Sequence, residues 1–312
     1  MRSIRTYRDV ADAGGEDVLA QVVGQNDRLA ARLARVDRIV VVASGKGGVG
    51  KSAIAANLAA ALADGGARVG AADADLNGPS LGRMLGARGP LVVGEDGVAP
   101  AAGAAGVRVM SMDLLLDEDD APLRWRGEAG AGADAPGGPA FLRQSLLEAG
   151  ALREFLADTA WGNLDFLVID APPGTDKLVR LLELLPRVDA LLLVTTPSEI
   201  ARFVVAKSAR LARDAGVRDV GLIANMTTHR CAACGHDSPL FDDDGARRLA
   251  ASTGLPVWAE IPFDARLPHA TDAGTPYVLA HAYAQAPAAR ALRDLASRLR
   301  RHAESRADAE AP

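Results

Sequence analysis

The stretch SGKGGVGKS, residues 44–52, constrains the fold more than any other part of the chain. It lies between an apolar run at 38–44 and a helical pattern at 52–63, and it fits the spacing G-x-x-x-x-G-K-S/T. A glycine-rich turn in this setting lets backbone N–H groups converge on phosphate oxygens at the positive end of the helix. The sequence therefore predicts a site for ATP and Mg²⁺, with Lys51 against the β and γ phosphates and the Ser52 hydroxyl on the metal. The turn itself consists of Gly45, Lys46, Gly47, Gly48, Val49 and Gly50.

Short apolar runs alternate with helical stretches along the rest of the chain. Most of these runs are continuously apolar, which is typical of strands that are covered on both faces. Alternating units of this kind predict an α/β fold with a doubly wound, mostly parallel sheet. We expect strands at 38–44, 68–73, 107–112, 166–170, 190–196, 220–225 and 257–261, with helices at 52–63, 198–215 and 242–253, and a small hairpin at 91–100.

The chain of 312 residues divides into three predicted parts. Residues 1–37 form a helical extension, because Val18, Val22, Leu29, Leu33 and Val36 suggest one amphipathic helix. Residues 38–290 form the P-loop domain, and residues 291–312 form a C-terminal helix and tail. Glycine, alanine and proline dominate 127–140, which predicts a flexible loop inside the domain.

Carboxylates follow two of the predicted strands. The segment DADLNGPS places Asp73 and Asp75 after the second strand, and FLVIDAPPG places Asp170 at the end of another. We expect Asp170 to be the Walker B carboxylate, Asp75 to orient the attacking water and Asp73 to assist in the magnesium shell. Gly174 then lies in the switch that senses the γ-phosphate.

Lys46 is a second lysine in the phosphate loop. The segment KGGVGKS resembles the deviant Walker A motif of the MinD, ParA and nitrogenase-iron-protein class of dimeric ATPases. The resemblance implies that Lys46 reaches across a homodimer to the partner's nucleotide, as an arginine finger does. It also implies that Asn225, at the end of VGLIAN, reads the adenine.

The only two cysteines of the chain, Cys231 and Cys234, form a C-x-x-C pair. Their place late in the chain argues against a thioredoxin-like role. Joined by His229 and His236 they would place four ligands within eight residues, which leaves little room for a tetrahedral site. Across the two-fold axis of a dimer, however, two copies of the pair supply the four thiolates that a 4Fe-4S cluster requires.

With these cysteines included, the chain resembles the Mrp/ApbC family of iron–sulfur cluster carriers. The shared segments include SGKGGVGKS, DADLNGPS, WGNLDFLVIDAPPGT and CAACG, and the resemblance covers roughly residues 38–290. It implies an ATP-hydrolysing homodimer that takes a 4Fe-4S cluster from a scaffold on Cys231 and Cys234 and delivers it to apo iron–sulfur proteins. The chain departs from the family after the switch, where Asp176 and Lys177 replace the usual Gly and Asp.

Two other functions share the ATPase residues. The C-x-x-C pair could bind a structural zinc between protomers, because zinc also accepts four thiolates. A MinD/ParA-like positioning ATPase would instead bind membrane or DNA, but we expect the apolar stripe of Leu292, Leu295 and Leu299 to pack on its own domain. The net charge of −5, the lack of a long apolar run and the charged N-terminus predict a cytoplasmic protein without nucleic-acid or membrane partners.

Overall fold

A computed structural model describes residues 15–89, 91–115, 140–231, 233–241 and 244–310. Its centre is a nine-stranded sheet in the order β10-β9-β8-β1-β7-β2-β6-β5, with β11 also paired to β9. Pairing is parallel except where β10 meets β9 and β5 meets β6. The strands are β1 (Val36–Ser44), β2 (Val69–Asp73), β5 (Ala101–Ala102), β6 (Arg108–Met110), β7 (Leu164–Asp170), β8 (Ala190–Thr195), β9 (Asp219–Arg230), β10 (Asp237–Pro239) and β11 (Val257–Phe263). The predicted α/β class and mostly parallel sheet are confirmed.

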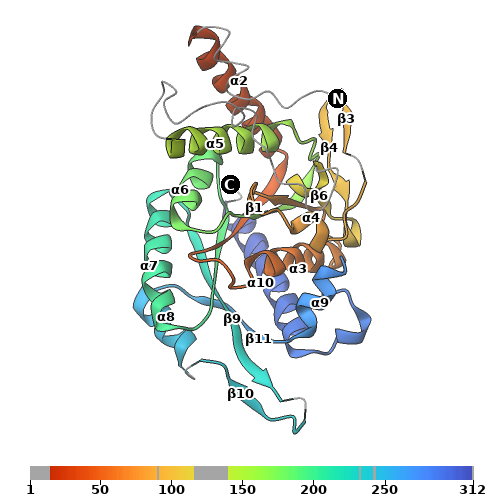
Figure 1. Cartoon of the computed structure of the whole chain (residues 1–312), viewed down its shortest axis with the longest axis vertical. Coiled ribbons are helices and arrows are strands. Elements are labelled where there is room, and N and C mark those ends of the chain that lie inside the picture. The colour runs from red at the N-terminus through yellow and green to blue at the C-terminus, as the bar shows by residue number, and fades with distance from the viewer. Residues whose placement is uncertain (1–14, 90, 116–139, 232, 242–243, 311–312) are drawn as a thin grey trace.

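Helices cover both faces of this sheet (Figure 1). Alternate residues of β1 separate the two cores, because successive side chains of a strand point to opposite faces. Ile39 and Val41 belong to one core, whereas Val40 and Val42 belong to the other. The first core packs under α2 (Gly15–Leu33), α5 (Ala140–Asp158), α6 (Thr175–Leu184), α7 (Glu199–Asp214) and α8 (Gly245–Thr253); the second packs under α3 (Lys51–Asp64), α4 (Leu81–Met84), α9 (Arg266–Asp272) and α10 (Pro287–Glu310).

The strand order also determines where a ligand can bind. The chain passes from β1 to β2 over the intervening β7, and β1 lies between β7 and β8. In doubly wound sheets the crevice at such a switch point, at the carboxyl ends of the strands, is where ligands bind. The segment after β1 is the predicted phosphate loop, so fold and motif indicate the same edge.

The N-terminal helix and the strand β9 depart from the sequence expectations. Helix α2 ends at Leu33, with Leu29 and Leu33 buried, but Val36 is the first residue of β1 and not part of the helix. Strand β9 was expected to end at Asn225 and continues to Arg230. The extension is a consequence of pairing with β10, which contacts residues 228–230.

Helices α5 and α6 were not predicted, whereas the hairpin at 91–100 is confirmed. The hairpin consists of β3 (Val92–Gly94) and β4 (Gly97–Ala99). Most of the glycine-rich stretch, residues 127–139, lies outside the described residues, and its residue 140 begins α5.

Helix α10 buries its apolar stripe against the domain. Leu292, Leu295 and Leu299 are at most 3% exposed, and the helix contacts α3 and β11. The prediction that this stripe packs on its own domain is confirmed. In the described residues, no helix has the length and apolarity needed to cross a membrane.

Candidate nucleotide and metal-cluster site

The phosphate loop connects the end of β1 to the start of α3. Gly48 and Gly50 have φ of +78° and +86°, values that a side chain would strain, and Gly50 caps the helix that Lys51 begins. Gly45 is required for a different reason: a Cβ there would lie 1.9 Å from Val204 Cγ1 of α7. Helix α7 therefore packs directly on the loop. The Ser44 hydroxyl donates to the Lys46 carbonyl at 2.9 Å, which fixes the start of the turn.

Lys51 forms a buried ion pair with Asp170. Its Nζ lies 2.5 Å from Asp170 Oδ1 and 3.2 Å from Ser52 Oγ, and both charged side chains are at most 8% exposed. Asp170 ends β7 beside β1, as expected for a Walker B carboxylate. Its second oxygen, Oδ2, is buried without a hydrogen-bond partner among the described residues. An oxygen in this state suits a cation ligand.

Asp73 lies directly across from Asp170, as its register partner on β2. Its carboxylate accepts hydrogen bonds from the backbone N–H groups of Asp75, Ser80 and Leu81 at 2.8–3.0 Å. Burial, and then the charge of Asp170, raise the pKa of Asp73 to about 7, although the three N–H donors act to lower it. Burial likewise raises the pKa of Asp170, with Lys51 opposing the shift. Two neighbouring buried carboxylates thus have one ammonium between them, on Asp170, and a divalent cation would offset the remaining negative charge.

Asp75 and Gly174 lie on the two loops that border this site. Asp75 is partly exposed on the loop that wraps around the Asp73 carboxylate. Gly174, with φ of +102°, precedes the first residue of α6, and its N–H donates to the Ser44 carbonyl at 3.4 Å. The predicted switch is therefore bonded to the end of β1, next to the phosphate loop.

Asn225 contacts the phosphate loop from β9. Its Nδ2 donates to the Val49 carbonyl at 2.8 Å, and the side chain is buried. The contact is close enough that a Cβ on Gly50 would lie 2.4 Å from the same nitrogen. The next residue, Met226, has φ of +58°, an uncommon value for a residue with a side chain. β9 thus changes direction immediately after its contact with the loop.

Lys46 is exposed on the outer side of the phosphate loop. Its position differs from that of Lys51, which is enclosed between α3 and β7. One lysine thus contacts the buried Asp170 of its own chain, and the other is exposed.

The cysteines lie in the loop between β9 and β10, a hairpin that projects from the body at the bottom of Figure 1. The Cys231 N–H donates to the His236 carbonyl, and the Gly235 N–H donates to the Cys231 carbonyl, both at 2.9 Å. Cys231 is half-buried and Cys234 is exposed, and both are free thiols. The backbone N–H groups of Cys234 and Ala233 lower the pKa of the Cys231 thiol, which favours the thiolate that binds metal.

An intrachain site on the cysteines and histidines finds no support. Among the described residues, which include Cys231, Cys234, His229 and His236, no group of three potential ligands is gathered around one point. His229 packs near the Phe263 ring instead, with centroids 6.0 Å apart. The loop therefore offers two thiols per chain.

Sequence reasoning missed Glu148 of α5. Its Oε1 accepts from Asn77 Nδ2 at 2.9 Å, and its Oε2 lies 3.8 Å from Lys177 Nζ. No local motif marks this residue, because its importance depends on the loops that the fold brings to it. The only sequence signal that could have led to Glu148 was Lys177, where the chain departs from the family pattern.

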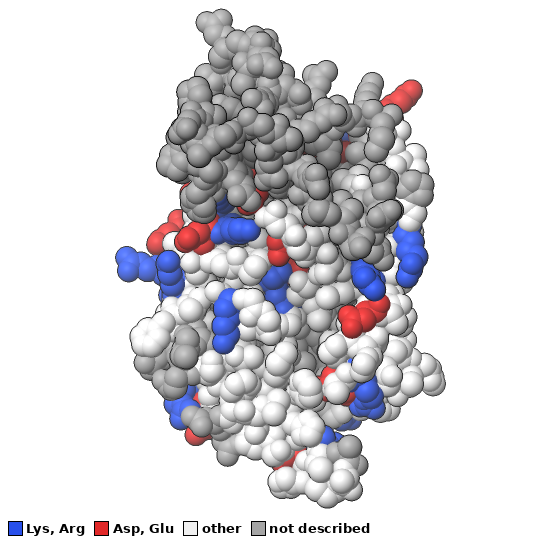
Figure 2. Space-filling view, in the orientation of Figure 1, with Lys and Arg blue, Asp and Glu red and all other residues white. Residues whose placement is uncertain are grey.

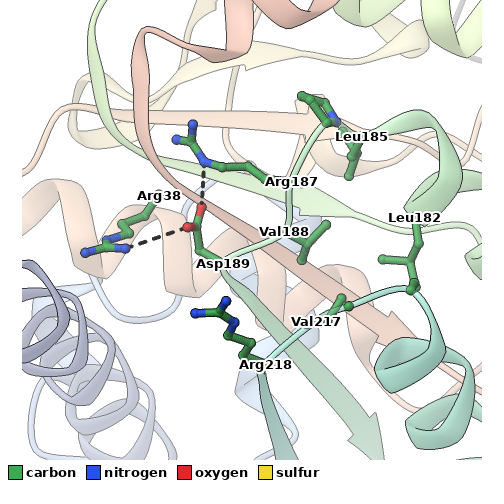
Figure 3. A pocket seen from close by; sticks show the side chains of 11 residues that line it. Arg38, Leu182, Leu185, Arg187, Val188, Asp189, Val217 and Arg218 are labelled. Carbon is green, nitrogen blue, oxygen red and sulfur yellow. Dashed lines mark hydrogen bonds and ion pairs between the residues drawn. The ribbon is translucent and has the colours of Figure 1, made fainter. Parts of the chain in front are cut away.

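A cavity with a volume of about 320 Å³ lies at the opposite edge of the sheet, at the amino ends of β1 and β8 (Figure 3). Asp189 lies 3.6 Å from Arg38 and 3.3 Å from Arg187, and its carboxylate also accepts from the Ile39 N–H. Arg38 donates to the Ala303 carbonyl of α10. These contacts join the amino ends of β1 and β8 to each other and to α10. They have a structural role, so the size of this cavity does not identify the nucleotide site.

A family model described as ParA: NUBPL iron-transfer P-loop NTPase matches residues 35–135 and 134–300. The iron-sulfur cluster carrier protein of Saccharolobus solfataricus is 37% identical over 242 residues, which are 77% of this chain and 76% of that protein. The protein of the same description from Pseudomonas fragi is 41% identical over 251 residues, 80% of each chain.

Solved structures agree with this relationship. A nucleotide-binding protein from Archaeoglobus fulgidus in complex with ADP is 32% identical, with a TM-score of 0.65 over 80% of this chain and 92% of that one. The cell division ATPase MinD of Pyrococcus furiosus, 23% identical over 85% of this chain and 98% of that one, shares the fold with a TM-score of 0.57. Fold and site thus define a nucleotide-binding P-loop NTPase of the MinD/ParA type. The chain belongs to the iron-transfer P-loop NTPase family, and the predicted resemblance to iron–sulfur cluster carriers is confirmed.

Proposed function

We propose that this protein is an ATP-hydrolysing carrier that holds a 4Fe-4S cluster between two protomers and transfers it to apo iron–sulfur proteins. Each protomer contributes Cys231 and Cys234, and a cluster-donating scaffold supplies the cargo. The observation that carries the proposal is the pair of free thiols, one half-buried and one exposed, that follows β9, the same strand that bonds to the phosphate loop through Asn225. Free thiols also suit a reducing cytoplasm.

The nucleotide half of the mechanism uses the buried polar groups. Ser52 Oγ and Asp170 Oδ2 would hold Mg²⁺, and Asp73 would support the loop next to it. The metal, when bound, neutralises charge on the phosphate oxygens. Lys51 then turns from Asp170 to the β and γ phosphates of ATP, and Asp75 orients the attacking water. Lys46 of each protomer reaches the partner's nucleotide, so hydrolysis depends on the dimer.

Strand β9 connects the nucleotide to the cluster. Cys231 follows Asn225 by six positions, about 20 Å in an extended strand. A change in the phosphate loop reaches Asn225 through the Val49 carbonyl, and the strand carries it to the cysteine loop. The distance between paired cysteine loops therefore depends on nucleotide state.

Anaerobic purification followed by metal and sulfide analysis tests cluster ligation. Four thiolates predict about four iron and four acid-labile sulfide per dimer, with a broad absorption band near about 400 nm. Cys231→Ala or Cys234→Ala should abolish cluster retention and leave ATP binding intact. His236→Ala is the matched control, because it changes the same loop without removing a thiol. Cluster content that survives either cysteine change would contradict the proposed ligation.

A zinc-bridged dimer is the second candidate, because the same free thiols favour it. Zinc in place of iron, persisting after anaerobic reconstitution, would identify it. The burial of the apolar stripe of α10 argues against a positioning ATPase, because that stripe is not free to bind a membrane. On the face shown in Figure 2, lysine and arginine are interspersed with acidic residues instead of forming one basic patch. Sedimentation with liposomes or DNA in the presence of ATP would restore that alternative if the protein pelleted.

A further inference from the structure

Two loops next to the nucleotide edge are joined through one glutamate. The loop after β2 carries Asp75 and Asn77, and the loop after β7 leads through Gly174 into α6, which carries Lys177. Glu148 lies in α5, which contacts α6 (Figure 1), and it meets both loops from there. Its carboxylate takes the Asn77 amide on one oxygen and the Lys177 ammonium on the other, at 2.9 and 3.8 Å.

The two loops are bonded at their bases, where the Ala74 N–H donates to the Asp170 carbonyl at 2.9 Å. Beyond that bond a cavity of about 180 Å³ lies between them, with Asn77, Glu148, Pro172 and Lys177 among its lining residues. Its floor is apolar, formed by side chains such as Leu152 and Leu181. Direct van der Waals contact across the gap is therefore reduced, and a larger share of the mechanical connection passes through the polar bridge.

The burial of Glu148 makes the bridge specific. Its side chain is 19% exposed, whereas that of Lys177 is 40% exposed. The Asn77 bond itself lies at the surface, but a hydrogen bond to an ionised carboxylate is stronger than one between neutral groups. The ion pair is long and partly solvated, so it contributes less to stability than to the placement of α6.

We propose that Glu148 is a positioning residue that keeps the Asp75 loop in register with the switch at Gly174. Displacement of the switch moves the first turn of α6, Lys177 moves with it, and Glu148 transmits the motion to Asn77. In this way Asp75, the water-orienting carboxylate two residues before Asn77, is brought into position when the switch is closed. This role rests on the proposed ATP hydrolysis. It also gives Lys177, which departs from the family pattern, a partner in this chain.

Steady-state kinetics on the full chain test the bridge. Glu148→Ala should lower kcat about three- to tenfold with little change in KM for ATP, because nucleotide binding residues are untouched. Glu148→Gln keeps an acceptor for Asn77 and should lose less. Lys177→Met should lower kcat as a single change, and it should have no further effect on kcat when it is combined with Glu148→Ala. Glu183→Ala is the control: Glu183 lines the same cavity, and no ion pair or hydrogen bond is found for it in the described residues.

Hydrogen exchange without turnover provides the second readout. Glu148→Ala should increase exchange in both 74–80 and 171–178, and Glu183→Ala in neither. An unchanged kcat, a loss confined to thermal stability, or Glu148 and Lys177 effects that simply multiply would overturn the bridge. A wild-type protein that hydrolyses no ATP would instead contradict the proposed function, and the exchange data would still decide the coupling of the two loops.

Discussion

Lys51, Asp73 and Asp170 form a cluster of charges that is costly to bury. Breaking a buried ion pair by removing one partner typically costs about 3–5 kcal/mol, and here a second buried carboxylate lies beside the pair. The pKa of Asp73 is raised to about 7 by burial and then by repulsion from the Asp170 charge. Binding of a cation and a polyphosphate would relieve it, because Lys51 can then pair with the phosphates and the metal with the carboxylates.

The environment of Asp264 lowers the pKa of its carboxylate, in contrast to that of Asp73. Hydrogen bonds from Arg266, and one from the Tyr277 hydroxyl, lower its pKa from 3.8 to about 2. The folded state therefore binds its proton less readily than the unfolded chain does, so the carboxylate stabilises the fold above about pH 4 and loses that effect as the pH falls towards 2. Since the Arg266 side chain is 53% exposed, we expect about 1 kcal/mol.

Urea unfolding of wild type and Asp264→Asn at several pH values measures this contribution. The difference in unfolding free energy should be constant from pH 7 to 5 and shrink below about pH 4. Asp272→Asn, at the end of helix α9, is the control for the loss of a nearby carboxylate. A difference close to zero between pH 7 and 5 would mean that the Arg266 contact is weaker in solution.

At the scale of the elements, α7 packs directly against the phosphate loop at Gly45. Gly45→Ala places a methyl group 1.9 Å from Val204 Cγ1, so α7 or the loop must move, and overpacking of this kind costs about 1–3 kcal/mol. Gly47→Ala in the same loop meets nothing within 4 Å and should change stability far less. Chemical unfolding of the two variants without nucleotide gives the comparison, and equal losses would show that the loop, not its contact with α7, sets the cost.

Local pattern was enough to predict the parallel strands and the phosphate loop, but not the short antiparallel strands β5 and β10. Continuous apolar runs and glycines with positive φ are determined by neighbours in sequence, so β1, β7 and residues 45–52 could be read directly. The end of β9 could not, because β10 extends it through pairing across the cysteine loop. Glu148 was missed for a similar reason: its two partners are 71 and 29 positions away, at Asn77 and Lys177.

At the scale of the whole molecule, the proposed function predicts that the buried and the exposed lysine of the loop act at the nucleotides of two different protomers. Lys51 faces Asp170 inside its own chain, and Lys46 is exposed. If Lys46 acts only in trans, a protomer without it still hydrolyses ATP when its partner supplies the lysine. A protomer with Lys51→Ala has a dead site of its own but can still supply Lys46.

Mixing Lys46→Ala with Lys51→Ala protein should therefore restore activity that neither variant has alone. Random exchange gives half heterodimers, each with one working site of two, so the mixture should reach about a quarter of the wild-type rate. A tag on each variant and light scattering with ATP would confirm that mixed dimers form. The Cys231→Ala protein, mixed with Lys51→Ala in the same way, is the control in which both variants keep Lys46. Mixed dimers without recovery would place Lys46 at the nucleotide of its own chain, and the link between hydrolysis and the cluster-bearing dimer would have to run through β9 alone.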